Sequence, residues 1–343
     1  MSENSKFPRN VGLKISGTGR FTPDVVVKND DFATIAGLET DDEWVTTRTG
    51  IKERRFNSGS TNYDMMAKAA KDALASANIS ANDIDMIIAT TASPDFFYPS
   101  MSCLMQNIIK AENAFAIDVH AACTGFVNAL DIARNYLSMG SVKRALIVSG
   151  EMLSNQMDFN DRTSCILFGD GAGAVIVEAA PDKLYFSHLG ARGETYAEPA
   201  LHCKALYRCN NPFADGHKWN APTEFVHGPH IIMNGKEVYK FATDIMPKAV
   251  KAVCEKAGVT LDDIDLLIPH QANIRIINTA MKSLDVPMEK VYVNIENTGN
   301  ISSACIPVCL DELYKSGRLT SGMKVCLVAF GAGLTYGSII FEV

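Results

Sequence analysis

The sequence predicts an α/β fold built from two similar halves, and three observations support this prediction. Helix-like and strand-like segments alternate along the 343 residues, a pattern typical of sheets covered by helices. Segments in the first half reappear in the second about 180 positions later, which indicates an internal repeat. Hydrophobic residues make up 47% of the chain, enough for a large core. We place the halves at residues 1–180 and 185–343.

The first repeated element runs from a helix into a buried strand. Residues 71–88 read KDALASANISANDIDMII, and residues 251–268 read KAVCEKAGVTLDDIDLLI. Asp83-Ile84-Asp85 matches Asp263-Ile264-Asp265, and each copy ends in an apolar run typical of a buried strand. Each copy therefore predicts a helix, a short polar turn and a strand.

Two further pairs follow in chain order. Residues 129–140 and 308–317 predict helices, and each precedes a strand, RALIVSG and KVCLVAFG. Residues 168–178 (FGDGAGAVIVE) match residues 330–342 (FGAGLTYGSIIFE). Both glycine-rich segments lead into strand-like residues rather than a helix, so they do not form a dinucleotide-binding loop. The alternation predicts mainly parallel sheets.

Composition excludes several classes of protein. The net charge is −7 without a lysine or arginine block, which argues against nucleic-acid binding. The N-terminal residues lack an apolar signal region, and no apolar stretch is long enough to cross a membrane. Nine scattered cysteines without a CxxC pair indicate reduced thiols, so we expect a cytoplasmic protein. His202, Cys203, Cys209 and His217 match no common zinc spacing, which favours a surface loop over a metal site.

The segment DVHAACTGFVNAL, residues 118–130, places Cys123 among small residues just before a predicted helix. A free cysteine is often a small buried hydrophobe. A helix N-terminus, however, lowers a thiol's pKa and makes it a nucleophile, so we expect a populated thiolate here. The repeat places the 300–303 segment at the matching position of the second half. If the halves pack about a pseudo-twofold axis, both helix N-termini converge on one site.

Two other segments offer groups that suit a cysteine nucleophile. His270 follows an apolar strand in LLIPHQANIRI, and Asn300 precedes an apolar helix in NTGNISSA. Taken singly, such a histidine is often structural and such an asparagine is often a helix cap. Together with Cys123, at positions that the repeat brings close, they predict a catalytic site.

The chain resembles the beta-ketoacyl-acyl-carrier-protein synthase III family of thiolase-fold condensing enzymes over nearly its whole length. The motifs that carry the resemblance are ISGTGRFTP, DEWVTTRTGIKERR, HAACTGF, DRTSCILFGDGAGA, MNGKEVYKFA, PHQANIRI, NTGNISSACIP and FGAGLTYGS. This resemblance implies a thiolase-like five-layered αβαβα fold, and it implies a homodimer.

The resemblance also implies a two-step reaction at Cys123, His270 and Asn300. The Cys123 thiolate attacks an acyl-CoA thioester and releases CoA. A malonyl-acyl-carrier protein then loses CO2, and its carbanion attacks the acyl-cysteine while His270 and Asn300 donate hydrogen bonds to the enolate oxygen. Backbone N–H groups of Cys123 and Ala332 form the oxyanion hole, although the family usually has glycine at the second position. No metal or organic cofactor is implied.

Binding roles follow from the same resemblance. CoA is expected to contact Trp44, Arg48, Arg162, Gly235 and Asn273. The acyl pocket is expected to be lined by Ile166, Leu167, Phe168, Met233 and Phe330, with Tyr98 reaching across a dimer interface where phenylalanine is common. Because carrier proteins are acidic and this chain is acidic too, docking needs a local basic patch. We expect that patch at Lys236, Lys240, Arg275 and Lys282.

Alternatives remain at this point. A condensing enzyme or acyltransferase of secondary metabolism would keep Cys123 and the CoA contacts but use another acceptor. An intact His270–Asn300 pair favours condensation over simple acyl transfer. A thiolase would carry a second catalytic cysteine in the final glycine-rich segment, and FGAGLTYG has none. Enzymes that elongate longer chains use two histidines, and Asn300 takes the place of the second. A non-catalytic acyl-CoA-binding protein would be expected to lose one of the three groups.

Overall fold

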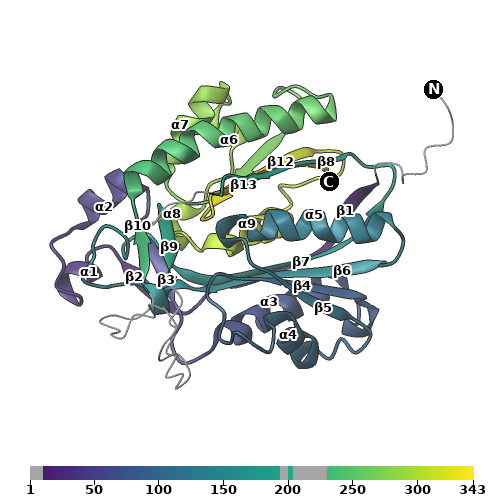
Figure 1. The fold of residues 1–343 in the computed structure, drawn as a ribbon, viewed down its shortest axis with the longest axis horizontal. Helices are drawn as coiled ribbons and strands as arrows, with labels where there is room; N and C mark the ends of the chain where they lie inside the picture. The colour runs from purple at the N-terminus through teal and green to yellow at the C-terminus, as the bar shows by residue number, and fades with distance from the viewer. Residues whose placement is uncertain (1–10, 194–199, 204–229) are drawn as a thin grey trace, which may run out of the picture.

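The computed structural model describes residues 11–193, 200–203 and 230–343. Figure 1 shows five layers, in which helices alternate with sheets. Helices α6 (Gly235–Ala257) and α7 (Ile274–Leu284) form one outer layer, and α3 (Asn62–Ala77) and α4 (Met101–Ile109) form the other. Helices α5 (Gly125–Ser138) and α9 (Cys305–Lys315) lie between the two sheets.

Each large sheet is built from one half of the sequence. The first has the order β1-β7-β6-β4-β5, with bounds β1 Gly12–Phe21, β7 Asp170–Ala180, β6 Arg144–Met152, β4 Met86–Thr90 and β5 Phe115–Val119. The second has the order β11-β12-β13-β8, with bounds β11 Leu266–Pro269, β12 Lys324–Gly331, β13 Thr335–Glu342 and β8 Tyr185–Ala191. The predicted strands are therefore confirmed, and both glycine-rich segments lead into strands, β7 and β13.

The prediction of mainly parallel sheets is wrong, because both sheets are mixed. Strand β4 runs parallel to β5 and β6, and β11 runs parallel to β12. Strand β7 runs antiparallel to β1 and β6, and β13 runs antiparallel to β12 and β8. Only a short turn separates β12 from β13, and β6 connects to β7 without an α-helix. A parallel pair needs a long crossover, so the short turn between β12 and β13 requires an antiparallel pair.

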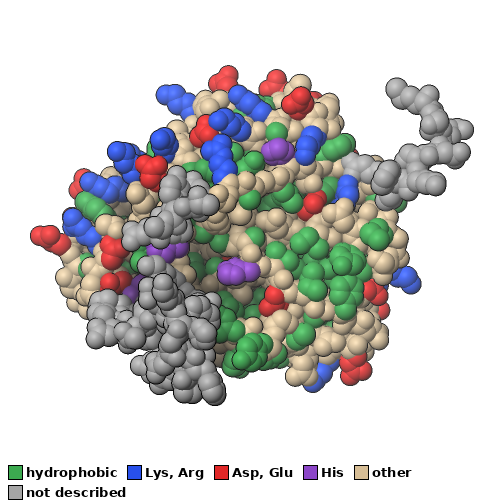
Figure 2. Space-filling model, viewed as in Figure 1, with side chains coloured by type: hydrophobic (Ala, Val, Ile, Leu, Met, Phe, Trp, Pro, Cys, Tyr) green, Lys and Arg blue, Asp and Glu red, His purple; other side chains and the backbone are tan. Residues whose placement is uncertain are grey.

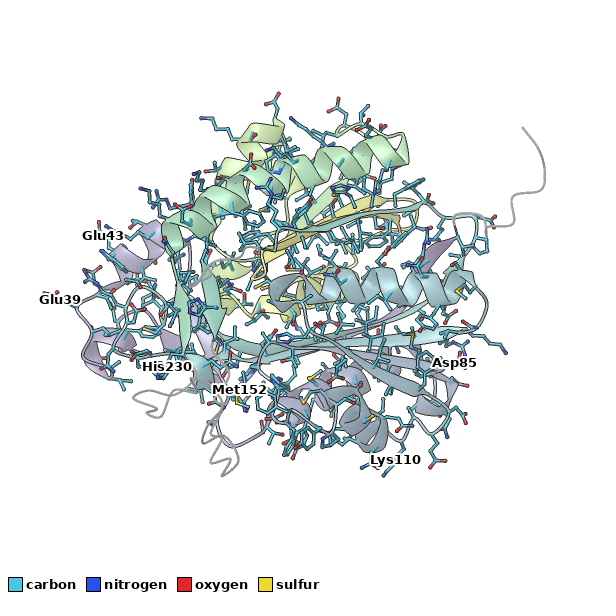
Figure 3. The ribbon with its side chains drawn as sticks, in the orientation of Figure 1. Glu39, Glu43, Asp85, Lys110, Met152 and His230 are labelled. Atoms are coloured by element: carbon cyan, nitrogen blue, oxygen red, sulfur yellow. The ribbon has the colours of Figure 1, made fainter. Side chains whose placement is uncertain are left out.

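The repeated aspartates have the same structural role in both halves. Asp85 accepts hydrogen bonds from the backbone N–H groups of Lys143 (2.8 Å) and Arg144 (3.0 Å) at the start of β6. Asp265 accepts one from Lys324 N at 2.8 Å, at the start of β12. Figure 3 shows Glu39 and Glu43 at the end of the molecule that contains α2 (Asp42–Thr49), and Asp85 at the opposite end. These repeated turns stabilise the end of the molecule away from α2.

The largest apolar cluster joins the two halves through the central helices. It combines Phe126 and Leu130 of α5 with Leu310 of α9, and all three side chains are buried. Strands of both sheets pack onto them, including Ile147 of β6 and Leu327 of β12. Burying side chains of this size stabilises the fold by roughly 1.5–3 kcal/mol each. The N-terminal ends of α5 and α9 are thus held together in the middle of the molecule.

Smaller elements surround one end of these layers. Strands β2 (Val25–Lys28) and β3 (Glu53–Phe56) pair with each other, as do β9 (Leu201–Cys203) and β10 (Ile231–Met233). Short helices α1 (Asp31–Thr34) and α8 (Ile295–Thr298) complete this end, together with α2. Among the described helices, none is both long and apolar enough to span a membrane.

Candidate active site

A cavity of about 240 Å³ brings together residues of both halves. Cys123 lies in the 3₁₀ turn η2 (Ala122–Thr124), directly before α5. His270 follows β11, and Asn300 precedes the 3₁₀ turn η5 (Ser302–Ala304), which leads into α9. All three residues line this cavity. The convergence predicted from the repeat is therefore present in the structure.

Cys123 is buried against the end of β12. A Cβ atom added to Gly331 would lie 2.9 Å from Cys123 N, so only glycine permits this close approach. Burial raises the pKa of the Cys123 thiol to about 12, although the hydrogen bond with Ser302 lowers it; the Glu151 charge raises it further. With this pKa the residue is a thiol at neutral pH, so the expectation of a populated thiolate is wrong. Desolvation outweighs the helix N-terminus here.

His270 is also buried, with only 1% of its surface exposed. Its backbone N–H donates to Val328 O at 2.8 Å, and its ring meets Phe330 edge-on at 5.5 Å between centroids. Burial lowers the pKa of His270 to about 3, so the imidazole is neutral at physiological pH. Its Nδ1 atom has no hydrogen-bond partner among the described residues. A neutral imidazole can donate one hydrogen bond from its protonated nitrogen.

Asn300 is fixed by hydrogen bonds on its backbone and its side chain. Its N–H donates to Leu167 O at 2.9 Å, and its carbonyl accepts from Gly169 N at 3.0 Å. The side-chain Oδ1 accepts from Ser302 N at 2.8 Å and from the Cys305 thiol at 3.9 Å. Asn300 therefore caps the η5 turn, and its NH₂ group is left as the donor that can serve a ligand.

Glu151 is a buried carboxyl group beside this site that the sequence analysis did not identify. It is fully buried, and burial raises its pKa. Its carboxyl oxygens accept hydrogen bonds from Ser303 Oγ (2.6 Å), Ser93 Oγ (2.9 Å) and Ala92 N (3.0 Å). These bonds tie the η5 turn to β6. The internal repeat could have indicated the contact between Glu151 and Ser303. Ser303 is the counterpart of Cys123 and Glu151 is the counterpart of Gly331, and Gly331 packs against Cys123.

Trp44 and two arginines form a stacked group at the cavity's rim. The guanidinium carbon of Arg48 lies 4.5 Å from the centroid of the Trp44 ring, and that of Arg162 lies 5.0 Å away. Asn273 Nδ2 donates to Arg48 O at 3.0 Å, which joins α7 to α2. Trp44, Arg48, Gly235 and Asn273 line the cavity, whereas Arg162 is held beside it by Trp44 and by Glu39 O.

The residues expected to form the acyl pocket divide into two groups. Those that line the cavity with Cys123 are Ile166, Leu167, Phe168, Met233 and Phe330. Tyr98 lies elsewhere and is 88% exposed. Tyr98 is therefore not part of the cavity wall in its own chain.

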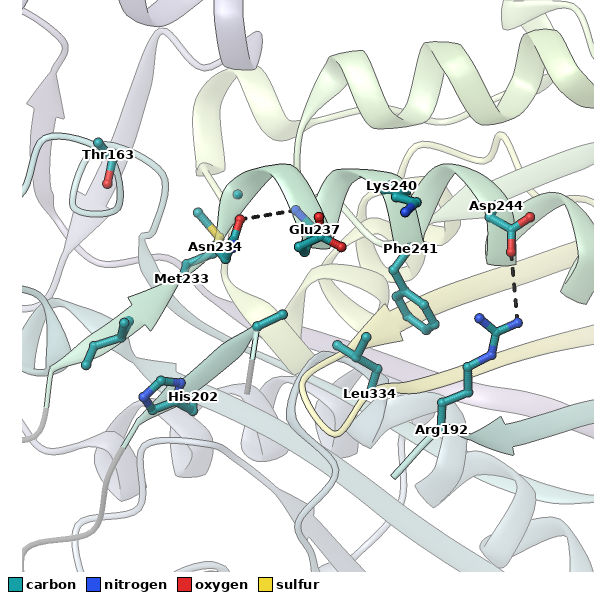
Figure 4. Close-up of a pocket in the computed structure, with 13 residues that line it drawn as sticks. Thr163, Arg192, His202, Met233, Asn234, Glu237, Lys240, Phe241, Asp244 and Leu334 are labelled. Carbon is teal, nitrogen blue, oxygen red and sulfur yellow. Dashed lines mark hydrogen bonds and ion pairs between the residues drawn. The ribbon is translucent and has the colours of Figure 1, made fainter. Parts of the chain in front are cut away.

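A larger hollow of about 950 Å³ adjoins this cavity and shares Thr163, Met233 and Gly235 with it (Figure 4). Lys240 lines the hollow, where an ion pair joins Arg192 and Asp244 at 3.9 Å. Lys236, Lys240, Arg275 and Lys282 are all exposed. Figure 2 shows Lys and Arg side chains gathered over α2, α6 and α7. The four residues belong to the last two of these helices.

The described residues contain no group of three or more His, Cys, Asp or Glu side chains placed to bind a metal. His202 and Cys203 lie on β9, while Cys209 and His217 lie outside the described residues. The eight cysteines of the described ranges are free thiols.

Comparison with known protein families gives two matches. The model of the 3-oxoacyl-[acyl-carrier-protein] synthase III C-terminal region matches residues 254–343. The model of 3-oxoacyl-[acyl-carrier-protein] synthase III matches residues 117–193. The first matched region contains His270 and Asn300, and the second contains Cys123.

Similar proteins extend these matches to the whole chain. The beta-ketoacyl-[acyl-carrier-protein] synthase III of Clostridium acetobutylicum is 44% identical over 331 residues, covering 96% of this chain and 98% of its own. The crystal structure of the Aquifex aeolicus synthase III is 40% identical with a TM-score of 0.86, covering 97% and 100%. The priming beta-ketosynthase of the R1128 polyketide pathway is 32% identical with a TM-score of 0.86, covering 98% of each chain.

Proposed function

The chain belongs to the 3-oxoacyl-[acyl-carrier-protein] synthase III family and is a condensing acyltransferase with a thiolase-like fold, and we propose that Cys123 is its acyl carrier. The proposed reaction joins an acyl-CoA starter to malonyl-acyl-carrier protein and gives 3-oxoacyl-acyl-carrier protein, CoA and CO2. This condensation initiates fatty-acid biosynthesis. The observation that supports these roles is the single cavity that contains Cys123, His270 and Asn300.

The first step transfers the acyl group to the cysteine. The Cys123 sulfur bonds to the thioester carbon, the carbon–sulfur bond to CoA breaks, and the thiol proton ends on the CoA sulfur. The N–H groups of Cys123 and Ala332 are proposed to bind the oxyanion of the tetrahedral intermediate. Ala332 directly follows Gly331, whose backbone packs against Cys123 N. One such donor is typically worth about 3 kcal/mol of the barrier.

The second step forms the new carbon–carbon bond. The malonyl group loses CO2, and the electron pair moves into an enolate. The enolate carbon bonds to the acyl carbonyl carbon, the bond from that carbon to the Cys123 sulfur breaks, and the released sulfur takes up a proton from water. Neutral His270 and the Asn300 amide are proposed to donate hydrogen bonds to the enolate oxygen. Burial supports this role for His270, because it holds the pKa at about 3 and keeps the ring uncharged. The proposed chemistry needs no cofactor.

Substrate binding is proposed to use the groups at both ends of the cavity. The Trp44–Arg48–Arg162 stack would hold the CoA adenine and phosphates, because aromatic rings and guanidinium groups stack on purines. Asn273 and Gly235 would line the pantetheine path, and the apolar wall at 166–168 would hold the acyl chain with Met233 and Phe330.

Docking and assembly are the remaining proposals. The exposed Lys236, Lys240, Arg275 and Lys282 would attract an acidic carrier protein. We propose a homodimer, since β5 lies at an edge of its sheet and Tyr98 is exposed. We also propose a cytoplasmic location, which the free cysteines support, and a division of the chain at residues 1–180 and 185–343, which the two large sheets support.

Separate assays of the two steps test the proposed roles. Purified wild type, His270→Ala and Asn300→Ala would be incubated with an acyl-CoA, and then with malonyl-acyl-carrier protein. We expect both variants to form acyl-Cys123, and their CO2 release to fall about 10²–10³-fold, as for the loss of an oxyanion donor. Loss of acylation with normal decarboxylation would contradict the assignment.

A priming role in polyketide synthesis is a second candidate, since a protein with that role matches this chain with the same TM-score as the Aquifex aeolicus enzyme. The same assay separates the two. Efficient condensation with the carrier protein of fatty-acid synthesis supports the first function, and condensation only with a dedicated polyketide carrier supports the second.

A further inference from the structure

Arg54 of β3 is a fully buried arginine behind the active site. Arginine is almost never fully buried unless it is paired. Among the described residues, no ion pair links Arg54 to a carboxylate, and its Nε atom has no hydrogen-bond partner. Burial lowers its pKa to about 10, so the side chain still carries a charge at neutral pH. The Arg54 guanidinium contacts backbone carbonyl groups instead of a carboxylate, and these contacts indicate its role.

The guanidinium group holds the wall of the acyl pocket from behind. Arg54 Nη2 donates to Ile166 O at 2.6 Å, and Nη1 donates to Val27 O at 3.1 Å. The group also lies 4.8 Å from the centroid of the Phe32 ring. A planar guanidinium presents several N–H groups in a fixed geometry, which suits two carbonyls on different segments. The position of Ile166 therefore depends directly on Arg54.

The same side chain packs under the segment that carries Asn300. A Cβ added to Gly299 would lie 3.0 Å from Arg54 Cβ, and one added to Gly169 would lie 3.2 Å away. These two glycines flank the bridge between Phe168 and Asn300, which Gly169 N and Asn300 O close at 3.0 Å. One buried residue thus supports both the acyl wall and the backbone of Asn300.

We propose that Arg54 is a positioning residue that sets which acyl chains the enzyme accepts, by fixing the 166–168 wall through the Ile166 carbonyl. This inference rests on the proposed function of the cavity. Burying a charge without an ion pair costs free energy, so stability alone does not account for an arginine here. The guanidinium instead gives the wall one defined position.

Arg55 provides a matched control on the same strand. Its side chain is partly exposed and pairs with Glu53 at 2.9 Å, and it does not line the cavity. The experiment compares wild type, Arg54→Met, Arg54→Lys and Arg55→Met. Each is incubated with straight and branched acyl-CoAs of increasing length, and the rate of acyl-enzyme formation is measured by intact-protein mass spectrometry. Thermal melting is recorded for every variant.

We expect Arg54→Met to change the rate ratio between the preferred acyl-CoA and longer ones by about tenfold, the lower end of the range for one methylene in a pocket. Arg54→Lys keeps the charge but cannot donate to both carbonyls in the planar geometry of a guanidinium, so its ratio is expected to shift in the same direction by a smaller factor. Arg55→Met is expected to keep the wild-type ratio.

A folded Arg54→Met with the wild-type ratio would overturn the inference, even if its melting temperature falls, because that result describes a purely structural residue. If Arg54→Met does not fold, Arg54→Lys decides: a shifted ratio supports the inference and an unchanged ratio overturns it. Failure of wild type to become acylated would contradict the proposed function instead.

Discussion

At the scale of single residues, the chemistry of the cavity is set by burial more than by formal charge. Cys123 and His270 are both shielded from water, and burial favours the neutral form of each. A neutral thiol and a neutral imidazole can share a small cavity without repulsion. Asn300 has no titratable group and keeps its orientation through Ser302 N. The cavity therefore presents uncharged donors to a substrate that develops negative charge.

His270 is expected to make the folded protein sensitive to acid. Its pKa is about 3 in the folded chain and about 6.5 in the unfolded chain. Between these values the unfolded state binds a proton that the folded state does not, so stability is lost as the pH falls below about 6.5. The loss approaches about 1.4 kcal/mol per pH unit.

Urea unfolding of wild type and His270→Gln at pH 7.5, 6.5 and 5.5 measures this dependence. The free energy of unfolding of wild type should decrease more steeply with acidification than that of the variant. Equal slopes would show that His270 does not stay neutral in the folded chain.

The sequence was sufficient to select these three residues as candidates, but it was not sufficient to predict their surroundings. Cys123, His270 and Asn300 each adjoin an apolar segment with a clear period, and the repeat relates two of their positions. The thiol pKa was not predictable, because it is raised mainly by burial and further by Glu151, and neither the burial of Cys123 nor its closeness to Glu151 is visible in the sequence. Glu151 lies within a strand and takes its partners from three other segments, so only the folded chain brings the network together.

At the scale of elements, the η2 and η5 turns are counterparts that meet in the middle of the molecule. Ala122 and Ser302 occupy equivalent positions and have φ values of +44° and +46°. A positive φ is unfavourable for residues other than glycine, and such backbone strain concentrates at functional sites. The central helices α5 and α9 start from these turns, which places the nucleophile and the Asn300 segment next to each other.

The close contact between β12 and η2 leads to a test of the oxyanion hole. In Gly331→Ala, the new Cβ would lie 2.9 Å from Cys123 N and 3.2 Å from Thr124 N, so the turn must move. If that N–H binds the oxyanion, acylation should slow by about 10²–10³-fold. Stopped-flow measurement of CoA release would report the rate.

Gly193→Ala is the matched control, because a Cβ there meets nothing within 4 Å. It should acylate at the wild-type rate. A Gly331→Ala protein that also acylates at the wild-type rate would show that the Cys123 N–H does not contribute.

Sequence reasoning located the repeated helices and strands, but it did not give the direction of every strand. Apolar periodicity distinguishes a strand from a helix, yet it does not distinguish a parallel neighbour from an antiparallel one. The short connection before β13 carries that information, whereas the connection before β7, residues 153–169, is long enough for either direction. The burial of Arg54 could not be predicted from the sequence either. It results from the packing of β3 against the 166–169 and 299–300 segments.

At the scale of the whole molecule, the first large sheet ends in an edge strand that has a neighbour on one side only. Strand β5 ends the order β1-β7-β6-β4-β5, and Phe115 on it is partly exposed. Phe97 and Tyr98 are 83% and 88% exposed, which is unusual for large aromatic side chains. An exposed strand edge and exposed aromatic residues are typical of a protein–protein interface.

We therefore expect the protein to be a dimer and Phe97→Asp to weaken it. A charge in a dry interface costs several kcal/mol, and an aromatic residue at its centre is a typical hot spot. Light scattering coupled to size-exclusion chromatography gives the mass of each protein. If Tyr98 completes the partner's acyl pocket, the monomeric variant should also lose acylation. A monomeric wild type at micromolar concentration would contradict the dimer.

The central claim is that Cys123 carries the acyl group, and intact-protein mass spectrometry tests it most directly. Wild type and Cys123→Ala would each be incubated with a series of acyl-CoAs and weighed without further substrate. We expect one added acyl group on wild type, for a preferred chain length, and none on Cys123→Ala. An acyl adduct of equal amount on Cys123→Ala, or tight CoA binding by wild type without any adduct, would contradict it.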